Sequence, residues 1–217
     1  MKMGIMDGVF SRGPIFGVIA FCLAGCSASM KTRSRIGPPF MKAWEESKTE
    51  HHDKCVELFT QSIQVSQGEA ALGHRPGADG ELAYGYALEY WSFALAGRAE
   101  CLKALGRTQE AKSDYEKCAE VSTQALEQGK NIPGWSGSHR GTIYGGRALS
   151  QKELGKLSEA IADLEESVKL QNEHCHTNFP MGTGHIRDSV CEQTANDMEL
   201  LAKWKKELAT QGKKGKP

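Results

Sequence analysis

Hydrophobic and small side chains recur every three or four positions along two stretches of the chain, and a glycine interrupts each stretch. The first stretch covers residues 93–121 and is broken at Gly106, and the second covers residues 144–168 and is broken at Gly155. A period of 3.6 residues predicts amphipathic helices, and glycine readily ends a helix. Each stretch therefore predicts two helices joined by a short turn, a helical hairpin with one apolar face to bury.

The two hairpins repeat one another in sequence, 49 residues apart. Residues 97–106 and 146–155 share a Gly-Arg-Ala start, a lysine and a closing Leu-Gly, and a Glu-Ala-x-x-Asp run follows each of them. A third, weaker copy covers residues 36–65, with Glu50 in the place of the glycine. Repeated units of this kind bury their apolar faces by stacking on one another. The pattern therefore predicts an all-α protein of stacked helical hairpins over residues 40–175.

The pattern resembles the tetratricopeptide repeat (TPR), a motif of about 34 residues. The resemblance covers about residues 92–125 and 141–174. It rests on small residues where the two helices touch, a turn glycine, a large apolar residue and a third small residue. These places are filled by Ala99, Ala111, Ala148 and Ala160, by Gly106 and Gly155, by Tyr115 and Leu164, and by Cys118 and Ser167. The chain departs from the family in its inserts near residues 66–83 and 128–141, which are rich in Gly and Pro.

The resemblance implies a binding function. In the TPR family the first helices of successive repeats line a concave groove, which would suit an extended peptide or a helix of a partner protein. Mapped residue by residue, the groove would be lined by Trp44, Phe93, Glu100, Lys103, Thr142, Leu149 and Lys152. We expect no enzymatic activity, because the chain has no phosphate-binding loop, no nucleophile elbow and no zinc-protease motif.

Two arginines occupy positions where the TPR pattern usually has leucine. Arg98 precedes Asp114 by 16 residues, and Arg147 precedes Asp163 by the same distance. A half-buried guanidinium needs an acceptor of opposite charge. The spacing therefore predicts an ion pair between the two helices of each hairpin, with a structural role.

Another amphipathic segment follows the repeats. Apolar residues recur at helical spacing between residues 185 and 208, with Glu and Lys between them. The end of a helical stack needs a helix that covers its last apolar face. We expect a loop and a capping helix over residues 176–210, followed by a basic tail at residues 211–217.

The first 25 residues predict an export signal that is removed. An apolar run at residues 15–25 follows Lys2 and Arg12 and is too short to span a bilayer. It ends in Leu23-Ala24-Gly25-Cys26, which resembles the lipobox of bacterial lipoproteins. In that family the signal is cut before the cysteine, which carries the acyl chains that hold the protein at the membrane. The resemblance therefore implies that Cys26 is lipidated, with palmitate among its acyl groups.

The segment after the lipid site has no apolar period. Residues 26–39 end in Pro38-Pro39, so we expect them to form a tether between the lipid and the folded domain. Ser27 stands where an inner-membrane retention signal such as Asp would be. If the source has two membranes, this favours the outer membrane, on its periplasmic or surface face.

Five cysteines remain when Cys22 and Cys26 are set apart. Three of them, at residues 55, 101 and 118, occupy small or apolar repeat positions and are expected to be buried thiols. Cys175 and Cys191 flank a loop outside the repeats, where a disulfide would tie the capping helix to the last hairpin.

A metal or redox site is the alternative interpretation of the same region. The candidate ligands are His174, Cys175, His176, His185 and Cys191. No C-x-x-C or H-x-x-x-H spacing occurs among them, and the sequence predicts no metal and no cofactor.

The charge balance narrows the class of partner. The chain has 27 basic and 27 acidic residues, so no overall field attracts nucleic acid. We expect a membrane-anchored protein–protein interaction module of an envelope complex, with an unidentified protein or peptide partner. A structural spacer or self-associating protein is a third interpretation.

Overall fold

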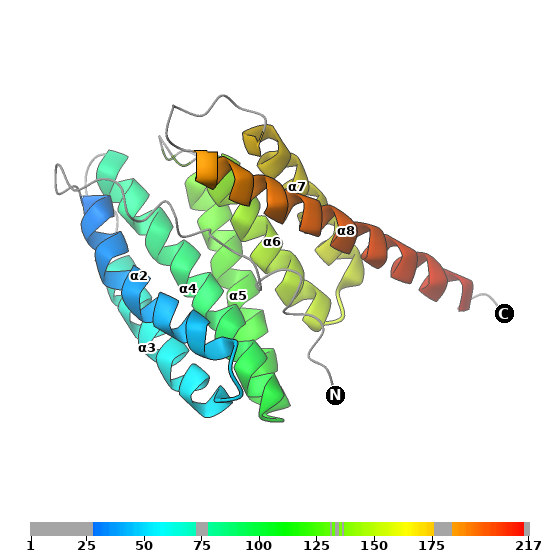
Figure 1. Ribbon diagram of the computed structural model, residues 1–217, viewed down its shortest axis with the longest axis horizontal. Coiled ribbons are helices and arrows are strands. Elements are labelled where there is room, and N and C mark those ends of the chain that lie inside the picture. Colours follow the sequence, from blue (N-terminus) through cyan, green and yellow to red (C-terminus); the bar gives the residue numbers. More distant parts are fainter. Residues whose placement is uncertain are drawn as a thin grey trace.

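The computed structural model describes residues 28–72, 78–130, 132, 135, 137–175 and 184–214. In these residues the chain forms seven α-helices and no β-strand (Figure 1). The helices are α2 (Ala28–Ser47), α3 (His52–Ala71), α4 (Ala78–Ala104), α5 (Thr108–Gly129), α6 (Gly137–Glu153), α7 (Leu157–Cys175) and α8 (Gly184–Lys214). The predicted all-α class is confirmed.

The helices form three stacked hairpins and a final helix. α2 pairs with α3, α4 with α5 and α6 with α7, and α8 packs against α7 (Figure 1). The first helices of the hairpins, α2, α4 and α6, also contact one another in that order. The weak upstream copy therefore forms a hairpin too, and α8 occupies the place expected for the capping helix.

Each of the two clear repeats turns at its glycine. Gly106 and Gly155 have φ angles of 75° and 78°, in the left-handed region that favours glycine. The residue after each glycine donates its backbone N–H back into the preceding helix, from Arg107 to the Leu102 carbonyl oxygen at 2.9 Å in the first repeat. The glycine thus lets the chain reverse while the last carbonyl groups of the helix keep donors.

Small residues let the helices approach closely. The four alanines of the repeat pattern, at residues 99, 111, 148 and 160, are at most 2% exposed. Gly97 of α4 lies against the ring of Phe59 in α3, where an added Cβ would be 2.3 Å from a ring carbon. The first two hairpins therefore pack at a distance that only glycine allows at this position.

The structure contradicts the expected tether at residues 26–39. From Ala28 onward these residues belong to α2, and Ile36 is fully buried against the first two hairpins. Asp79 in α4 accepts hydrogen bonds from the backbone N–H of Ala28 and, at 2.6 Å, from the hydroxyl of Ser29. A carboxylate from another helix thus caps the start of α2, and the residues around Ala28 do not predict this cap.

Two prolines inside α2 made the segment look non-helical. Pro38 is exposed and Pro39 is half-buried, and the residues four positions earlier, Ser34 and Arg35, are exposed. The carbonyl groups that lose their intrahelical donors therefore lie on a turn where water can replace the missing bonds. Tertiary packing on the other side of α2 holds the helix together.

Helices take up both ends of each insert. α4 is 27 residues long and begins at Ala78, so it takes up the end of the first insert. In the second insert Ile132 and Trp135 are buried, and the Trp135 ring lies where a Cβ on Gly129 would be. These segments thus add to the core of the stack.

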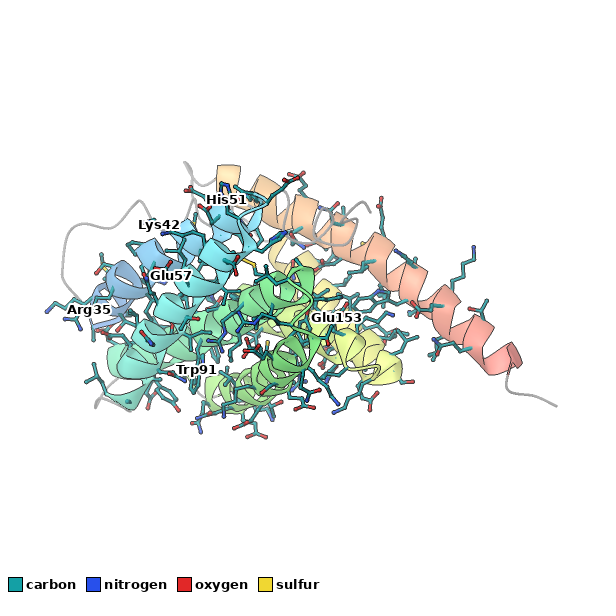
Figure 2. The ribbon with its side chains drawn as sticks, turned by 90° about the horizontal axis from the view of Figure 1, so that it is seen from below. Arg35, Lys42, His51, Glu57, Trp91 and Glu153 are labelled. Carbon is teal, nitrogen blue, oxygen red and sulfur yellow. A yellow bond between two sulfur atoms is a disulfide. The ribbon has the colours of Figure 1, made fainter. Side chains whose placement is uncertain are left out.

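α8 is longer than the expected capping helix. It runs for 31 residues and continues to Lys214, into the region expected to be a frayed tail (Figures 1 and 2). Both views show its C-terminal half extending past the ends of α6 and α7. Among the described helices none is long and apolar enough to cross a bilayer.

Candidate interaction surface

Both predicted ion pairs are present, and each extends to a third residue. Arg98 donates to both carboxylate oxygens of Asp114, with Nε and Nη2 each 2.7 Å from oxygen. Its Nη1 donates to the hydroxyl oxygen of Thr60 in α3 at 3.1 Å. The guanidinium therefore joins its own hairpin to the preceding one.

The next hairpin repeats this arrangement. Arg147 donates to both oxygens of Asp163 at 2.7 Å and to Thr123 Oγ1 in α5 at 2.9 Å. Both carboxylates are nearly buried, so these are not solvated surface pairs. The repeat pattern does not indicate the threonines, because Thr60 and Thr123 are 63 residues apart whereas the pattern has a period of 49.

The seven expected groove residues lie on the first helices, but most of them contact other helices of the chain. Lys103 pairs with Glu153 of α6, and Lys152 pairs with Glu207 of α8 at 2.9 Å. Glu100 accepts a hydrogen bond from the hydroxyl of Tyr115. The charged side chains expected to face a free groove are therefore engaged within the stack.

The apolar members of the set are also partly used in packing. Trp44 is 6% exposed, and Phe93 is half-buried, with its ring against Gly146 of α6. Leu149 is half-buried beside the cluster that contains Trp204 of α8, and Thr142 is half-exposed on α6. The expectation of an open groove is thus corrected: these seven side chains form a surface that is largely packed against other helices, and we call it the first-helix face.

Burial perturbs one acid on this face. Removal from water raises the pKa of the Glu100 carboxyl, against the lowering effects of the Tyr115 hydrogen bond and of nearby Lys103. A partner that approaches Lys103 would therefore meet one accessible ammonium group and a carboxylate that is held inward.

A polar cluster that the sequence pattern did not indicate lies on α2, α4 and α6. The guanidinium of Arg33 in α2 stacks on the Tyr86 ring of α4, 3.7 Å from its centroid. His139 of α6 lies with Nδ1 3.1 Å from the buried carboxylate of Glu89 and with Nε2 3.5 Å from Arg33. The cluster connects α2, α4 and α6. Arg33 was expected in the tether, so nothing in the pattern brought it to this place.

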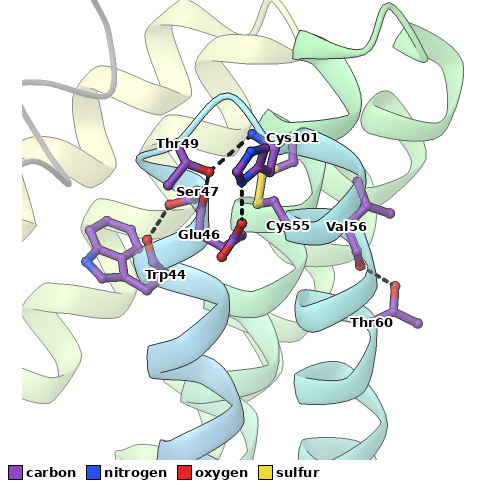
Figure 3. Close-up of a disulfide and its surroundings, with 9 residues drawn as sticks. Trp44, Glu46, Ser47, Thr49, Cys55, Val56, Thr60 and Cys101 are labelled. Carbon is purple, nitrogen blue, oxygen red and sulfur yellow. Dashed lines mark hydrogen bonds and ion pairs between the residues drawn. A yellow bond between two sulfur atoms is a disulfide. The ribbon is translucent and has the colours of Figure 1, made fainter.

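Two disulfides cross between helices. Cys55 of α3 is joined to Cys101 of α4, which ties the first hairpin to the second (Figure 3). Cys175 at the end of α7 is joined to Cys191 of α8, as the sequence predicted. The expectation of buried thiols is wrong for Cys55 and Cys101, because the packing of α3 on α4 brings them together, 6.2 Å apart between Cα atoms.

Cys118 is a buried free thiol, as expected. It is fully buried in α5 beside Ser122, and burial raises its pKa to about 11. At neutral pH it is a thiol and not a thiolate, so it is a poor nucleophile and metal ligand.

The region of the alternative metal site is only partly described. Cys175 and Cys191 are bonded to each other, which occupies both sulfur atoms. His176 and the side chains of His174 and His185 lie outside the described residues. Among the side chains that the structure describes, no three His, Cys, Asp or Glu residues are arranged to hold a metal ion. Cys26, the expected lipid site, also lies outside the described residues.

A buried acid lies between α7 and α8. Asp197 of α8 is 3% exposed and accepts hydrogen bonds from the amide groups of Gln193, at 2.8 Å, and Gln171, at 3.3 Å. Burial raises its pKa to about 6. The carboxyl thus sits among neutral donors, at the point where α8 docks.

Comparison with known proteins identifies the repeats. The model of the tetratricopeptide repeat matches residues 94–124 and 141–174, which lie in the second and third hairpins. DnaJ homolog subfamily C member 7 from Mus musculus is 29% identical over 93 residues, and the Homo sapiens protein of that name is 30% identical over 94. Each match covers 43% of this chain and 16% of the relative, so the chain spans about a sixth of the relatives' length. No solved structure matches significantly.

Proposed function

We propose that this chain is an exported, lipid-anchored module that binds another protein through its first-helix face. The two TPR units carry the binding part of the proposal, because stacked helical hairpins of this family present their first helices as a shared surface. The partner would belong to an envelope-associated complex, and it would contact a mixture of apolar and charged side chains.

The ion pairs on the first-helix face are suited to exchange with a partner. The side chains of Lys103 and Lys152 are 42% and 27% exposed, and each lysine pairs with one carboxylate of a neighbouring helix. Exposed pairs of this kind contribute only about 0.2–1 kcal/mol. A carboxylate of a bound peptide can therefore replace Glu153 or Glu207 at little cost, while Phe93 and Leu149 supply apolar contact.

The disulfides support export. Disulfides persist in oxidising compartments and are rare in the cytosol. This chain places four of its cysteines in two disulfides, at Cys55–Cys101 and Cys175–Cys191. That usage agrees with an export signal and with a lipid on Cys26, and we place the protein at the outer membrane where the source has one.

Anchoring is tested with a Cys26→Ala variant. Metabolic labelling with a palmitate analogue should mark the unaltered chain in the membrane fraction and should leave the variant unlabelled. A labelled variant, or an unlabelled parent that still sediments with membranes, would contradict lipidation at this cysteine.

Binding is tested by gentle cross-linking in membranes, followed by purification of the full-length protein. One envelope protein should be recovered, and Lys103→Glu combined with Lys152→Glu should reduce its recovery at least tenfold. The matched control is Lys112→Glu with Lys117→Glu, which reverses two exposed charges on α5, outside the first-helix face. Equal loss in both double variants would show that net charge, and not this face, holds the partner.

A further inference from the structure

α8 has the position of a first helix, and no second helix follows it in the part of the chain that the structure describes. Ser150 of α6 contacts Cys118 of α5, and Asp197 of α8 contacts Ser167, the residue of α7 that corresponds to Cys118 in the repeat. Asp197 is therefore the counterpart of Ser150. Two residues earlier stand Ala148 in α6 and Ala195 in α8.

These two alanines differ in what covers them. Ala148 is fully buried in a cluster with Ala160 and Leu164 of α7, the second helix of its hairpin. Ala99 is buried in the same way against Ala111 and Tyr115 of α5. Ala195 is exposed, because no second helix follows α8 in the part of the chain that the structure describes.

The uncovered side of α8 continues beyond Ala195 at helical spacing. Met198 is 54% exposed, and Ala202 and Ala209 on the same side are also exposed. We call this strip, with Ala195, the outer face of α8. It carries one of the few large apolar side chains of the described residues that are open to water.

The charges beside the outer face are divided between the two halves of the helix. Glu192 and Glu199 lie along one edge in the first half, and Lys203 and Lys206 continue that edge in the second half; all four are exposed. None of the four has an ion pair within the described residues. In an antiparallel pair of identical helices the same edges meet in opposite directions, so the acidic half of one faces the basic half of the other.

We propose that the outer face of α8 binds a second copy of this chain, as an antiparallel pair of α8 helices about a two-fold axis. The partner helix takes the place that α5 and α7 take in the complete hairpins. The pairing buries Met198 and the three alanines of the outer face, and it sets Glu192 and Glu199 of each copy opposite Lys203 and Lys206 of the other.

The contact is small, which sets its strength. A single helix pair with one large apolar residue per copy buries less than the roughly 1,200 Å² typical of stable complexes. We therefore expect a dissociation constant in the micromolar range or above in solution. Anchoring to one membrane would raise the effective concentration and favour the dimer without new contacts.

The experiment uses sedimentation velocity of the full chain in mild detergent from about 1 μM to about 1 mM, which spans weak association. Three samples are compared: the parent chain, a basic variant with Glu192→Lys and Glu199→Lys, and an acidic variant with Lys203→Glu and Lys206→Glu. All four positions are exposed, so circular dichroism should show unchanged folding. The matched control, Glu116→Lys with Glu120→Lys, makes the same charge change as the basic variant, but on α5.

The parent and the control should dimerise, and each α8 variant alone should stay monomeric, because its paired edges then carry like charges. An equimolar mixture of the two variants should form a heterodimer, at least tenfold tighter than either variant with itself. A parent that is monomeric throughout, or α8 variants that still dimerise, would overturn the proposal. A monomeric parent whose α8 cross-links to a different protein in membranes would assign the outer face to that protein and overturn it as well.

Discussion

Arg147 shows how a single residue in this stack depends on two neighbours. Its guanidinium binds Asp163 of its own hairpin and Thr123 of the preceding one, and its side chain is only 17% exposed. Removal of one acceptor leaves a charge that is mostly shielded from water. The repeated pairs of Arg98 and Arg147 are therefore points where loss of one partner is costly, although an intact pair adds little net stability.

Asp163→Ala should lower the free energy of unfolding by about 3 kcal/mol, because it leaves Arg147 half-buried without a counter-charge. Urea unfolding measures the change. Glu120→Ala on α5 removes an exposed partner of Lys117 and serves as the comparison, with an expected change within about 0.5 kcal/mol. Similar losses in both variants would contradict the distinction between the two kinds of pair.

Asp197 gives the protein a pH dependence of a definite sign. Its pKa is about 6 in the fold, raised from 3.8, so the folded state holds the proton more tightly than the unfolded chain. The penalty for burying the carboxylate is absent below about pH 4, grows between pH 4 and 6, and stays at neutral pH, where it reaches at most about 3 kcal/mol. Asp197→Asn should therefore stabilise the fold at pH 7.5 and leave it nearly unchanged at pH 4. Thermal unfolding at both pH values measures this, and an equal gain at both would contradict the titration.

At the residue scale, the contacts that could be predicted from the sequence are those whose residues repeat. Arg98 and Asp114 recur at the same spacing as Arg147 and Asp163, so chemistry and register together pointed to their pairing. The pairing of Cys55 with Cys101 could not be predicted, because it depends on how far α3 slides along α4. Nothing local carries that information.

At the scale of the helix, α2 shows that local sequence patterns do not predict a helix whose stability comes from packing against other elements. Pro38 and Pro39 argued against a helix, and they are tolerated because the residues four positions earlier, Ser34 and Arg35, are exposed to water. The contacts that hold α2 come from other elements. Asp79 of α4 caps its start, and Glu69 of α3 binds Thr32 and Arg35 at 2.8 Å. Hairpins with a glycine turn were predictable, whereas a helix held from outside was not.

The turn glycines allow a direct test of backbone conformation. Gly106→Ala should destabilise the protein by about 1–2 kcal/mol, because φ is 75° there while no atom obstructs the added methyl group. Gly68 lies inside α3, also with nothing near its Cβ position, so Gly68→Ala should stabilise by about 0.5–1 kcal/mol. Urea unfolding of the two variants should give changes of opposite sign. A loss in both would mean that unseen crowding, and not φ, sets the cost.

Across the whole molecule, the hairpins are bound in series by different means. The first two share a large apolar core and a disulfide, and the same core continues through α5 to Ile143 of α6, where Arg147 also reaches back to Thr123. α8 is docked on the last hairpin by Trp204 and the disulfide at Cys175–Cys191. Stability should therefore vary along the stack, as in other linear repeat proteins.

Removing the first disulfide should affect the first two hairpins most. Cys55→Ala with Cys101→Ala opens a loop of 46 residues and should lower the free energy of unfolding by about 3–4 kcal/mol on the chain-entropy model. Hydrogen exchange should speed up in α2, α3 and α4 more than in α7. The comparison is Cys175→Ala with Cys191→Ala, which should mainly expose α8. Equal acceleration everywhere would show that the stack unfolds as one unit.

The disulfide between Cys55 and Cys101 also changes how the chain would respond to tension. A pull on its N-terminal end passes from residue 55 directly to residue 101 through the sulfur atoms, so the 46-residue separation does not lengthen. At about 3.4 Å per residue, roughly 150 Å of extensible length is locked away. Under load α2 would detach first and α3 could not be drawn out behind it. A protein bound further along the chain would therefore stay close to the point at which the N-terminal end is held.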